Sequence, residues 1–193
     1  MGQANKRKAD KLGWHATLTQ DEQIVADAAQ LIHHRLSKTD KFVGACFFYA
    51  FFLRKYLRQE KGIAVTPVAG WALTKDVRSG QETVFGHGWA DFGGKLIDIS
   101  LTQIQPYKAL TTPPGDLIVL DRIVASGKTS YTYFADTTPA IAAMLAADGA
   151  TGQRRLNEVA DQRERAADDA KIDAYFDDAP SEFRYAHVLT LLR

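Results

Sequence analysis

An unbroken apolar run constrains this chain most, because it has to be covered on every side. Residues 42–53 read FVGACFFYAFFL and contain no charged residue. The run is shorter than the roughly 20 residues that a bilayer-spanning helix needs. A helix that is apolar on nearly every face lies inside a domain. We therefore predict a central core helix that opens at Gly44 and stops near Gly62, with other elements packed around it.

An amphipathic helix is predicted just before this core helix. Thr19 and Glu22 have the spacing of a capping box, in which each residue satisfies a backbone N–H of the other. Apolar residues then recur at helical intervals, which predicts a helix over residues 20–36.

The middle of the chain alternates in the manner of β-strands. Its apolar runs are bounded by Gly, Pro or polar clusters, which indicates an antiparallel sheet packed on the core helix. These runs are residues 62–73, 83–92, 95–100, 116–126 and 129–136.

Composition and charge narrow the function classes. The chain of 193 residues carries a formal net charge of +1, so it has no global excess of positive charge for nucleic acid. Its single cysteine cannot form an internal disulfide, and Met1 is followed by a polar, basic run rather than by an apolar signal segment. We expect a cytoplasmic protein that binds no membrane, with residues 1–18 as a flexible basic N-terminus.

After the strand segments the pattern becomes helical again. Pro139 stands at a first-turn position, and residues 153–176 carry charges of both signs on most faces. Such a segment is typical of a surface helix, and a partner-docking helix is the second interpretation. We predict one domain over residues 19–149 and a C-terminal helical extension over residues 150–193, in which His187 belongs to a packing helix.

A glycine pair indicates how two of the strands are paired. Gly93 and Gly94 suit a two-residue hairpin turn, because the central residues of such a turn need a positive φ. Counting outward from the turn places Trp89 opposite Asp98, with His87 two residues further along the same strand. His87 and Asp98 then share a face as diagonal neighbours, roughly 7 to 8 Å apart at their Cα atoms. This predicts a hydrogen bond between the imidazole and the carboxylate.

The apolar neighbours of Asp98 in the sequence explain why it would need a hydrogen bond to His87. Asp98 lies between two isoleucines, where an unpaired buried carboxylate would be costly. His87 supplies a partner, and the carboxylate in turn fixes the histidine tautomer and stabilises its protonated form, as a catalytic base requires. Gly86 and Gly88 leave room for a substrate beside the ring, or else serve sheet packing. Trp89 is either a core residue or a wall of the substrate cleft.

Cys46 is the candidate nucleophile. A thiol becomes nucleophilic when it ionises, which a helix N-terminus or a nearby imidazolium favours. Cys46 stands close to the predicted opening of the core helix. Taken alone, the residue favours the alternative of a structural core cysteine, because free cysteine is among the most buried residue types.

The order of these residues resembles the core of the transglutaminase-like branch of the papain-like cysteine enzymes. That core has Gly-x-Cys at a helix start, a Gly-Ile exit from the helix, a His-x-Trp strand and an aspartate on the next strand. The matching residues lie within 44–100 and are Gly44, Cys46, Ala50, Leu53, Arg54, Leu57, Arg58, Gly62, Ile63, Gly70, His87, Trp89 and Asp98. Three features depart from the family: Ile99 and Ser100 follow the aspartate in place of Pro-Thr, the Gly62-Ile63 exit lacks the usual proline two residues on, and no side chain is assigned as oxyanion donor.

The resemblance implies an α+β, papain/transglutaminase-like fold, in which a central helix carries Cys46 and packs on an antiparallel sheet with flanking N- and C-terminal helices. It implies acyl transfer through a Cys46, His87 and Asp98 triad, without a cofactor, on amide bonds of a peptide or protein. Such an enzyme is a peptidase, an amidase or deamidase, or a transglutaminase. The departures favour the alternative of a catalytically inactive module of this fold that binds a peptide or protein partner.

A metal site is not indicated. The five histidines and one cysteine show no ligand spacing. His33 and His34 project to different faces of the first helix, and we expect them and His15 at the surface. The sequence selects neither the substrate, nor water or an amine as acyl acceptor, nor the oligomeric state.

Overall fold

The computed structural model describes residues 13–37, 42, 45–75, 80–101, 117–123 and 130–193. These residues form an α+β fold around a six-stranded sheet in the order β5-β4-β3-β2-β1-β6. All the strand pairs are antiparallel, which confirms the predicted sheet. The strands are β1 (Thr66–Lys75), β2 (Glu82–Phe92), β3 (Lys95–Asp98), β4 (Ile118–Val119), β5 (Arg122–Ile123) and β6 (Ser130–Phe134).

The segment 116–126, predicted as one strand, folds into two short strands over its described part. β4 and β5 pair with each other as a hairpin. Leu120 and Asp121 turn the chain with φ values of 50° and 64°, in a region that glycine usually occupies, so the turn carries no glycine signal. The Asp121 carboxylate accepts a hydrogen bond of 2.8 Å from the Leu96 N–H, which fastens the hairpin to β3.

The first predicted helix is confirmed with its capping box. In α2 (Gln20–Leu36), the Thr19 hydroxyl accepts from the Glu22 N–H, and the Glu22 carboxylate accepts from the Thr19 N–H. Glu22 also pairs with Lys95 at the β2–β3 hairpin, so the helix start is tied to the sheet. The face of α2 turned to the interior consists of Val25, Ala26, Ala28, Ala29, Ile32 and Leu36.

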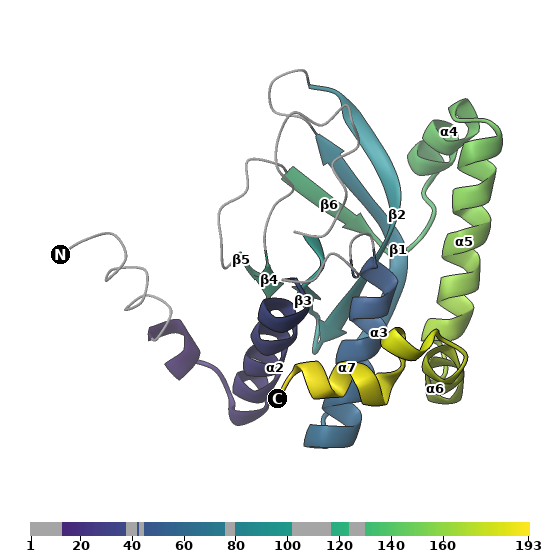
Figure 1. Ribbon diagram of the computed structural model, residues 1–193. Coiled ribbons are helices and arrows are strands. Elements are labelled where there is room, and N and C mark those ends of the chain that lie inside the picture. Colours follow the sequence, from purple (N-terminus) through teal and green to yellow (C-terminus); the bar gives the residue numbers. More distant parts are fainter. Residues whose placement is uncertain (1–12, 38–41, 43–44, 76–79, 102–116, 124–129) are drawn as a thin grey trace.

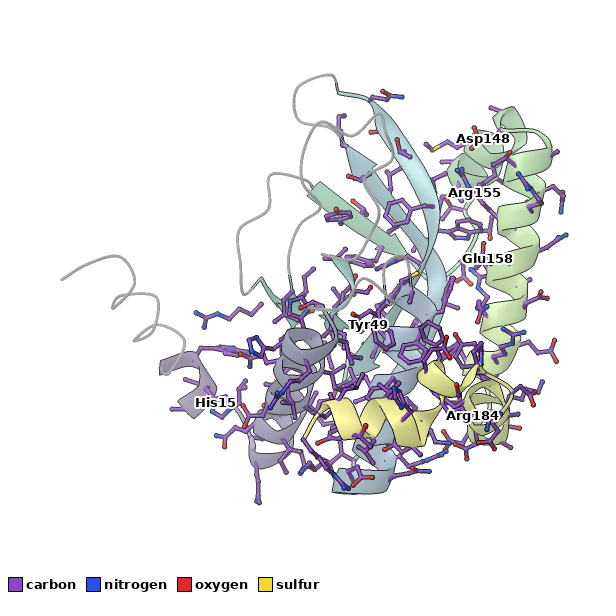
Figure 2. All side chains as sticks on the ribbon, viewed as in Figure 1. His15, Tyr49, Asp148, Arg155, Glu158 and Arg184 are labelled. Carbon is purple, nitrogen blue, oxygen red and sulfur yellow. The ribbon has the colours of Figure 1, made fainter. Side chains whose placement is uncertain are left out.

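The central helix is also confirmed. α3 (Cys46–Tyr56) continues as a π-helical turn, η2 (Leu57–Lys61), and ends at Gly62, whose φ of 68° is left-handed. Most of the α3 side chains are buried, and the helix contacts α2, α6, β1 and β2. Figure 2 shows Tyr49 of α3 in the interior, surrounded by side chains of neighbouring elements. The predicted opening residue, Gly44, lies outside the described residues.

The C-terminal part is helical, as predicted. Its elements are α4 (Pro139–Ala147), α5 (Ala150–Ala166), α6 (Asp169–Asp177), the 3-10 turn η4 (Ser181–Phe183) and α7 (Tyr185–Leu191). Pro139 occupies the first turn of α4 behind the N-cap Thr138, and the charged segment divides into two helices because Asp168 caps α6 anew. α4 and α5 stand together beside the sheet, while α7 crosses near α3 (Figure 1). None of the described helices has the length and apolarity that crossing a bilayer requires.

The helices beyond residue 149 share one hydrophobic core with the sheet and α3. The Phe176 ring of α6, for example, lies 5.3 Å from the Phe48 ring of α3. The exposed charges expected for this segment lie on both α5 and α6, for example at Glu158 and Lys171. Core side chains from the C-terminal helices include Val159, Ile172, Phe176 and Val188.

A cluster of ion pairs also joins α6 to α3 and η2. Arg54 donates to Asp169 at 3.0 Å, and Lys55 donates to Asp173 at 2.6 Å. Arg58 reaches both carboxylates, at 2.8 Å and 2.7 Å. Lys55 is only 6% exposed, so its charge depends on the partner that α6 supplies.

Candidate active site

The β2–β3 hairpin has the register that the sequence predicts. Phe92 pairs with Lys95 across two turn glycines, whose φ values are 61° and 82°. The ladder continues outward to the pair Ala90 and Ile97, and His87 and Asp98, which lie beyond that pair, meet on the same face of the sheet.

The predicted hydrogen bond between these two side chains is present. The His87 Nε2 and the Asp98 Oδ2 are 2.5 Å apart, and both side chains are completely buried. A charge-assisted contact of this length, shielded from water, holds the imidazole ring in one orientation. The ring therefore lies below the surface rather than along an open cleft.

Asp98 accepts further hydrogen bonds that the sequence did not reveal. The N–H and the hydroxyl of Ser100 donate to Oδ1, at 3.0 Å and 2.9 Å. The Tyr133 hydroxyl donates to Oδ2 at 2.8 Å. The carboxylate thus has both oxygens satisfied without help from water. Ser100, one of the departures from the family pattern, supports Asp98 directly.

Tyr133 is the site residue that sequence reasoning missed. It comes from β6, which joins the sheet beside β1 and is separated from β2 by that strand. Its ring lies 5.2 Å from the Trp89 ring and 6.0 Å from the His87 ring. Burial, and then the negative charge of Asp98, raise the pKa of Tyr133 well above its usual range, so the hydroxyl remains a donor.

The two buried charges displace each other's pKa in opposite directions. Burial is the largest influence on each, and alone it would raise the pKa of Asp98 and lower that of His87. The attraction and hydrogen bond between the two groups outweigh it. The pKa of Asp98 is consequently lowered and that of His87 is raised, which favours a carboxylate paired with an imidazolium.

Cys46 is the first residue of α3 and is partly exposed, unlike His87. The preceding residue, Ala45, provides no side-chain cap, so no capping side chain uses the N–H groups of the first helical turn. These N–H groups carry the positive end of the helix dipole and can donate to a negative charge that forms beside Cys46.

The free ring nitrogen of His87 completes the arrangement. Its Nδ1 is buried and has no hydrogen-bond partner among the described residues. The Cys46 sulfur acts on the same ring, where it adds to the effect of Asp98 in raising the pKa of His87. One nitrogen of the imidazole is therefore held by Asp98, and the other is available on the side of the thiol.

Gly88 explains how the start of α3 comes so close to His87. A Cβ atom at Gly88 would lie 2.8 Å from the Cα of Phe47 and 3.0 Å from the carbonyl oxygen of Cys46. At Gly86 it would lie 2.7 Å from a methyl group of Val159. Of the two interpretations, these contacts favour sheet packing, because atoms of α3 and α5 lie where a Cβ atom would stand at either glycine.

Trp89 is likewise a core residue. It is 7% exposed, and its ring stacks at 24° to the His87 ring with a centroid distance of 6.3 Å. Gly70 of β1 makes room for it, since a Cβ atom there would lie 2.7 Å from the Trp89 ring. Trp89 therefore packs beside the imidazole and fixes its plane.

The other histidines do not join the site. His15 contacts Asp27 at 3.0 Å near the surface. His33, expected at the surface, is partly buried and donates from Nδ1 to the carbonyl of Ile99 at 2.9 Å, which steadies the chain after Asp98. The described residues contain no group of three His, Cys, Asp or Glu side chains placed to hold a metal ion.

Comparisons with known proteins identify no family for this chain. No protein-family model, no curated protein and no solved structure matches the chain.

Proposed function

We propose that the protein is a thiol-dependent acyl-transfer enzyme that acts on amide bonds of a peptide or protein. Cys46 is the nucleophile, His87 the general base and acid, and Asp98 the group that orients His87. The observation that carries this proposal is the buried imidazole, which has one nitrogen fixed by a carboxylate and the other, on the side of a thiol, without a hydrogen-bond partner among the described residues.

The reaction follows from the positions of these groups. The Cys46 thiolate forms a bond to the carbonyl carbon of the amide, and the carbonyl electron pair moves to oxygen. N–H groups of the first turn of α3 stabilise that oxyanion. The carbon–nitrogen bond then breaks, and the departing amine takes a proton from the His87 imidazolium. Water or an amine next attacks the thioester and gives its proton to His87, which releases the acyl group and restores the Cys46 thiolate beside the His87 imidazolium.

The finer fold assignment belongs to the same proposal. A cysteine at a helix start, with histidine and aspartate on neighbouring antiparallel strands, supports a papain/transglutaminase-like arrangement. A reactive thiol needs reducing surroundings, which agrees with a cytoplasmic location.

Alkylation of the single cysteine tests the activated thiol. At about pH 6, an isolated thiol with a pKa of about 8.5 is only about 0.3% ionised. We expect iodoacetamide to modify Cys46 readily in the folded protein at that pH, and His87→Ala to slow the reaction by about tenfold or more. His187→Ala, an exposed histidine of α7, is the matched control and should react like the wild type. Equal rates in all three proteins would refute an activated pair.

A second experiment identifies the acyl acceptor. Peptides that contain glutamine, and peptides with ordinary amide bonds, are incubated with the protein in the presence or absence of an added amine. Hydrolysis alone indicates a peptidase or deamidase, whereas incorporation of the amine indicates a transglutaminase. Cys46→Ala should abolish either activity.

Complete burial of His87 and Asp98 favours a second candidate, an inactive module that binds a peptide or protein. In that case iodoacetamide should modify the partly exposed Cys46 at about pH 6 no faster than an isolated thiol, with no change in His87→Ala, and no peptide should be turned over. The same alkylation experiment therefore separates the two candidates.

A further inference from the structure

A pocket of about 950 Å³ lies where the start of α3 meets α5, α6 and η4. This volume is at the upper end of the range for small-molecule sites and exceeds that of one side chain. Apolar residues from three of these elements and from the chain between α6 and η4 form much of its lining, namely Ala45, Phe48, Ala174, Tyr175, Pro180 and Phe183.

The pocket adjoins the candidate nucleophile. Ala45, which lines it, directly precedes Cys46 at the start of α3. Tyr175, also in the lining, lies close enough to the Cys46 sulfur for its pKa to respond: burial raises that pKa most, the Arg165 charge lowers it, and the sulfur raises it again. A ligand in this pocket is therefore held beside the thiol.

The charged side chains around the pocket do not balance. Lys171 is neutralised by Glu164 at 2.7 Å, whereas Arg165, 5.6 Å from the centre of the Tyr175 ring, keeps its own positive charge. Three carboxylates and two cations therefore leave the lining with one net negative charge. The remaining charged lining residues are Asp161 and Asp178, and neither has an ion-pair partner among the described residues.

Asp178 stands where a negative charge is unfavourable for the helix itself. It is the C-cap of α6, at the end where the helix dipole is negative, and the last turn of α6 has no basic residue. Asp177 precedes it, so two carboxylates follow one another at this helix end. A cation bound in the pocket would relieve this repulsion.

We propose that the pocket binds a segment of the substrate peptide in which a bulky apolar side chain stands next to a lysine or arginine. The apolar side chain lies against Phe48, Tyr175 and Phe183, and the cation faces Asp161 and Asp178. The assignment of this segment to the substrate rests on the proposed acyl-transfer function. The binding itself does not, because it requires no chemistry at Cys46.

Binding is tested with the full chain carrying Cys46→Ala, so that no turnover occurs. Three fluorescein-labelled hexapeptides are identical except for their two central residues, which are Leu-Lys in the first, Leu-Glu in the second and Gly-Lys in the third. Fluorescence anisotropy measures their affinities for the protein. We expect the Leu-Lys peptide to bind most tightly. Asp178→Asn should weaken its binding about threefold, and the double change with Asp161→Asn about tenfold, while the Leu-Glu peptide loses nothing.

Two matched variants control this experiment. Asp177→Asn removes the same charge from the same helix end but from a side chain outside the lining, and it should leave the affinity for Leu-Lys nearly unchanged. Ala174→Trp fills the pocket and should abolish binding, whereas Ala170→Trp, on an exposed part of α6 outside the lining, should not.

Equal affinity for the Leu-Lys and Leu-Glu peptides, or equal effects of Asp178→Asn and Asp177→Asn, would overturn the proposal. Binding that follows the expected pattern, in a protein whose Cys46 proves unreactive, would refute the acyl-transfer function and leave the peptide site standing. The alkylation experiment can therefore refute the acyl-transfer function without refuting the peptide site, and the anisotropy experiment can refute the peptide site without refuting the function.

Discussion

Asp98 and His87 tie the candidate site to the stability of the fold. The pKa of Asp98 is lowered from 3.8, so its contribution is present above that value and is lost as the pH falls through the folded pKa. The pKa of His87 is raised from 6.5, so its contribution is complete below that value and is lost as the pH rises through the folded pKa. The pair stabilises the protein most between these two ordinary values.

Asp98→Asn should expose this dependence. The change leaves a buried imidazole without a charged partner, so we expect the free energy of unfolding to fall by about 3 to 5 kcal/mol near pH 6. The deficit should shrink between about pH 6.5 and 10, because the wild type loses its own His87 contribution as the pH rises to the folded pKa of about 10. Urea unfolding at several pH values measures the difference. A deficit that stays constant over this range would show that the pair is uncharged in the folded protein.

Tyr133→Phe removes one of the donors to Asp98 and retains the ring. We expect unfolding to become about 1 kcal/mol easier, and alkylation of Cys46 at about pH 6 to slow severalfold, because the carboxylate is held less firmly against His87. Tyr185→Phe removes a hydroxyl that donates to Glu60 at 3.3 Å at the surface, and it should change neither property. An unaltered alkylation rate in Tyr133→Phe would limit Tyr133 to a packing role.

At the residue scale, the contact between His87 and Asp98 could be predicted from the sequence, whereas the contact of Tyr133 with Asp98 could not. The contact between His87 and Asp98 follows from counting outward from a two-residue turn, and the structure has that register. Tyr133 reaches Asp98 from a strand paired with β1, and no local pattern states which strand lies beside β1. Residues brought together by strand order are therefore found only when the sheet is known.

At the scale of elements, the contact between α3 and β2 sets the distance from thiol to imidazole. The strand offers glycine at the two positions where the helix and α5 approach it most closely. Close approach of this kind leaves no space for a side chain, and backbone atoms cannot move aside as a flexible side chain can.

Gly88→Ala tests this contact. Its new methyl group would meet the Phe47 Cα at 2.8 Å, so the start of α3 has to move away from the sheet. We expect a loss of about 1 to 3 kcal/mol in the free energy of unfolding, together with slower alkylation of Cys46 at about pH 6. Gly13→Ala is the control, because a Cβ atom there meets nothing within 4 Å. Unchanged alkylation in Gly88→Ala would separate the helix position from the reactivity of the thiol.

The elements differ in how well they can be predicted from their own sequences. The capping box of α2 and the apolar run of α3 are local patterns, and both helices form where they predict. The turn between β4 and β5 places Leu120 and Asp121 at positive φ without a glycine, so the apolar run reads as one strand. A local sequence pattern predicts an element when the residues of that element determine its conformation. The pattern fails when contacts with a neighbouring strand determine the conformation.

At the scale of the whole molecule, the C-terminal helices complete a single core. They bury Val159, Ile172, Phe176 and Val188, and full burial of such side chains contributes about 6 to 12 kcal/mol in all. This is comparable to the whole stability of an ordinary domain, about 5 to 15 kcal/mol. The polar character of residues 153–176 in the sequence conceals this, because a few buried positions are enough to dock an otherwise charged helix.

A chain that ends at residue 149 should therefore fail to fold cooperatively. We expect it to bind the dye ANS and to lose the near-ultraviolet circular dichroism signal of its packed aromatic residues, because Phe48 and Phe52 of α3 lose their cover. Circular dichroism and ANS fluorescence measure both effects. A sharp unfolding transition in the shortened chain would mean that residues 19–149 form an independent domain.

The ion pairs between α3 and α6 join two segments that are synthesised far apart in time. Arg54 and Asp169 are 115 positions apart, and Lys55 and Asp173 are 118 apart. The cysteine therefore leaves the ribosome long before the carboxylates that secure its helix, and domains fold as their segments emerge. Until translation has passed Asp173, the newly made thiol lacks its finished surroundings. The order of synthesis itself thus delays the finished surroundings of Cys46 until Asp173 has been made.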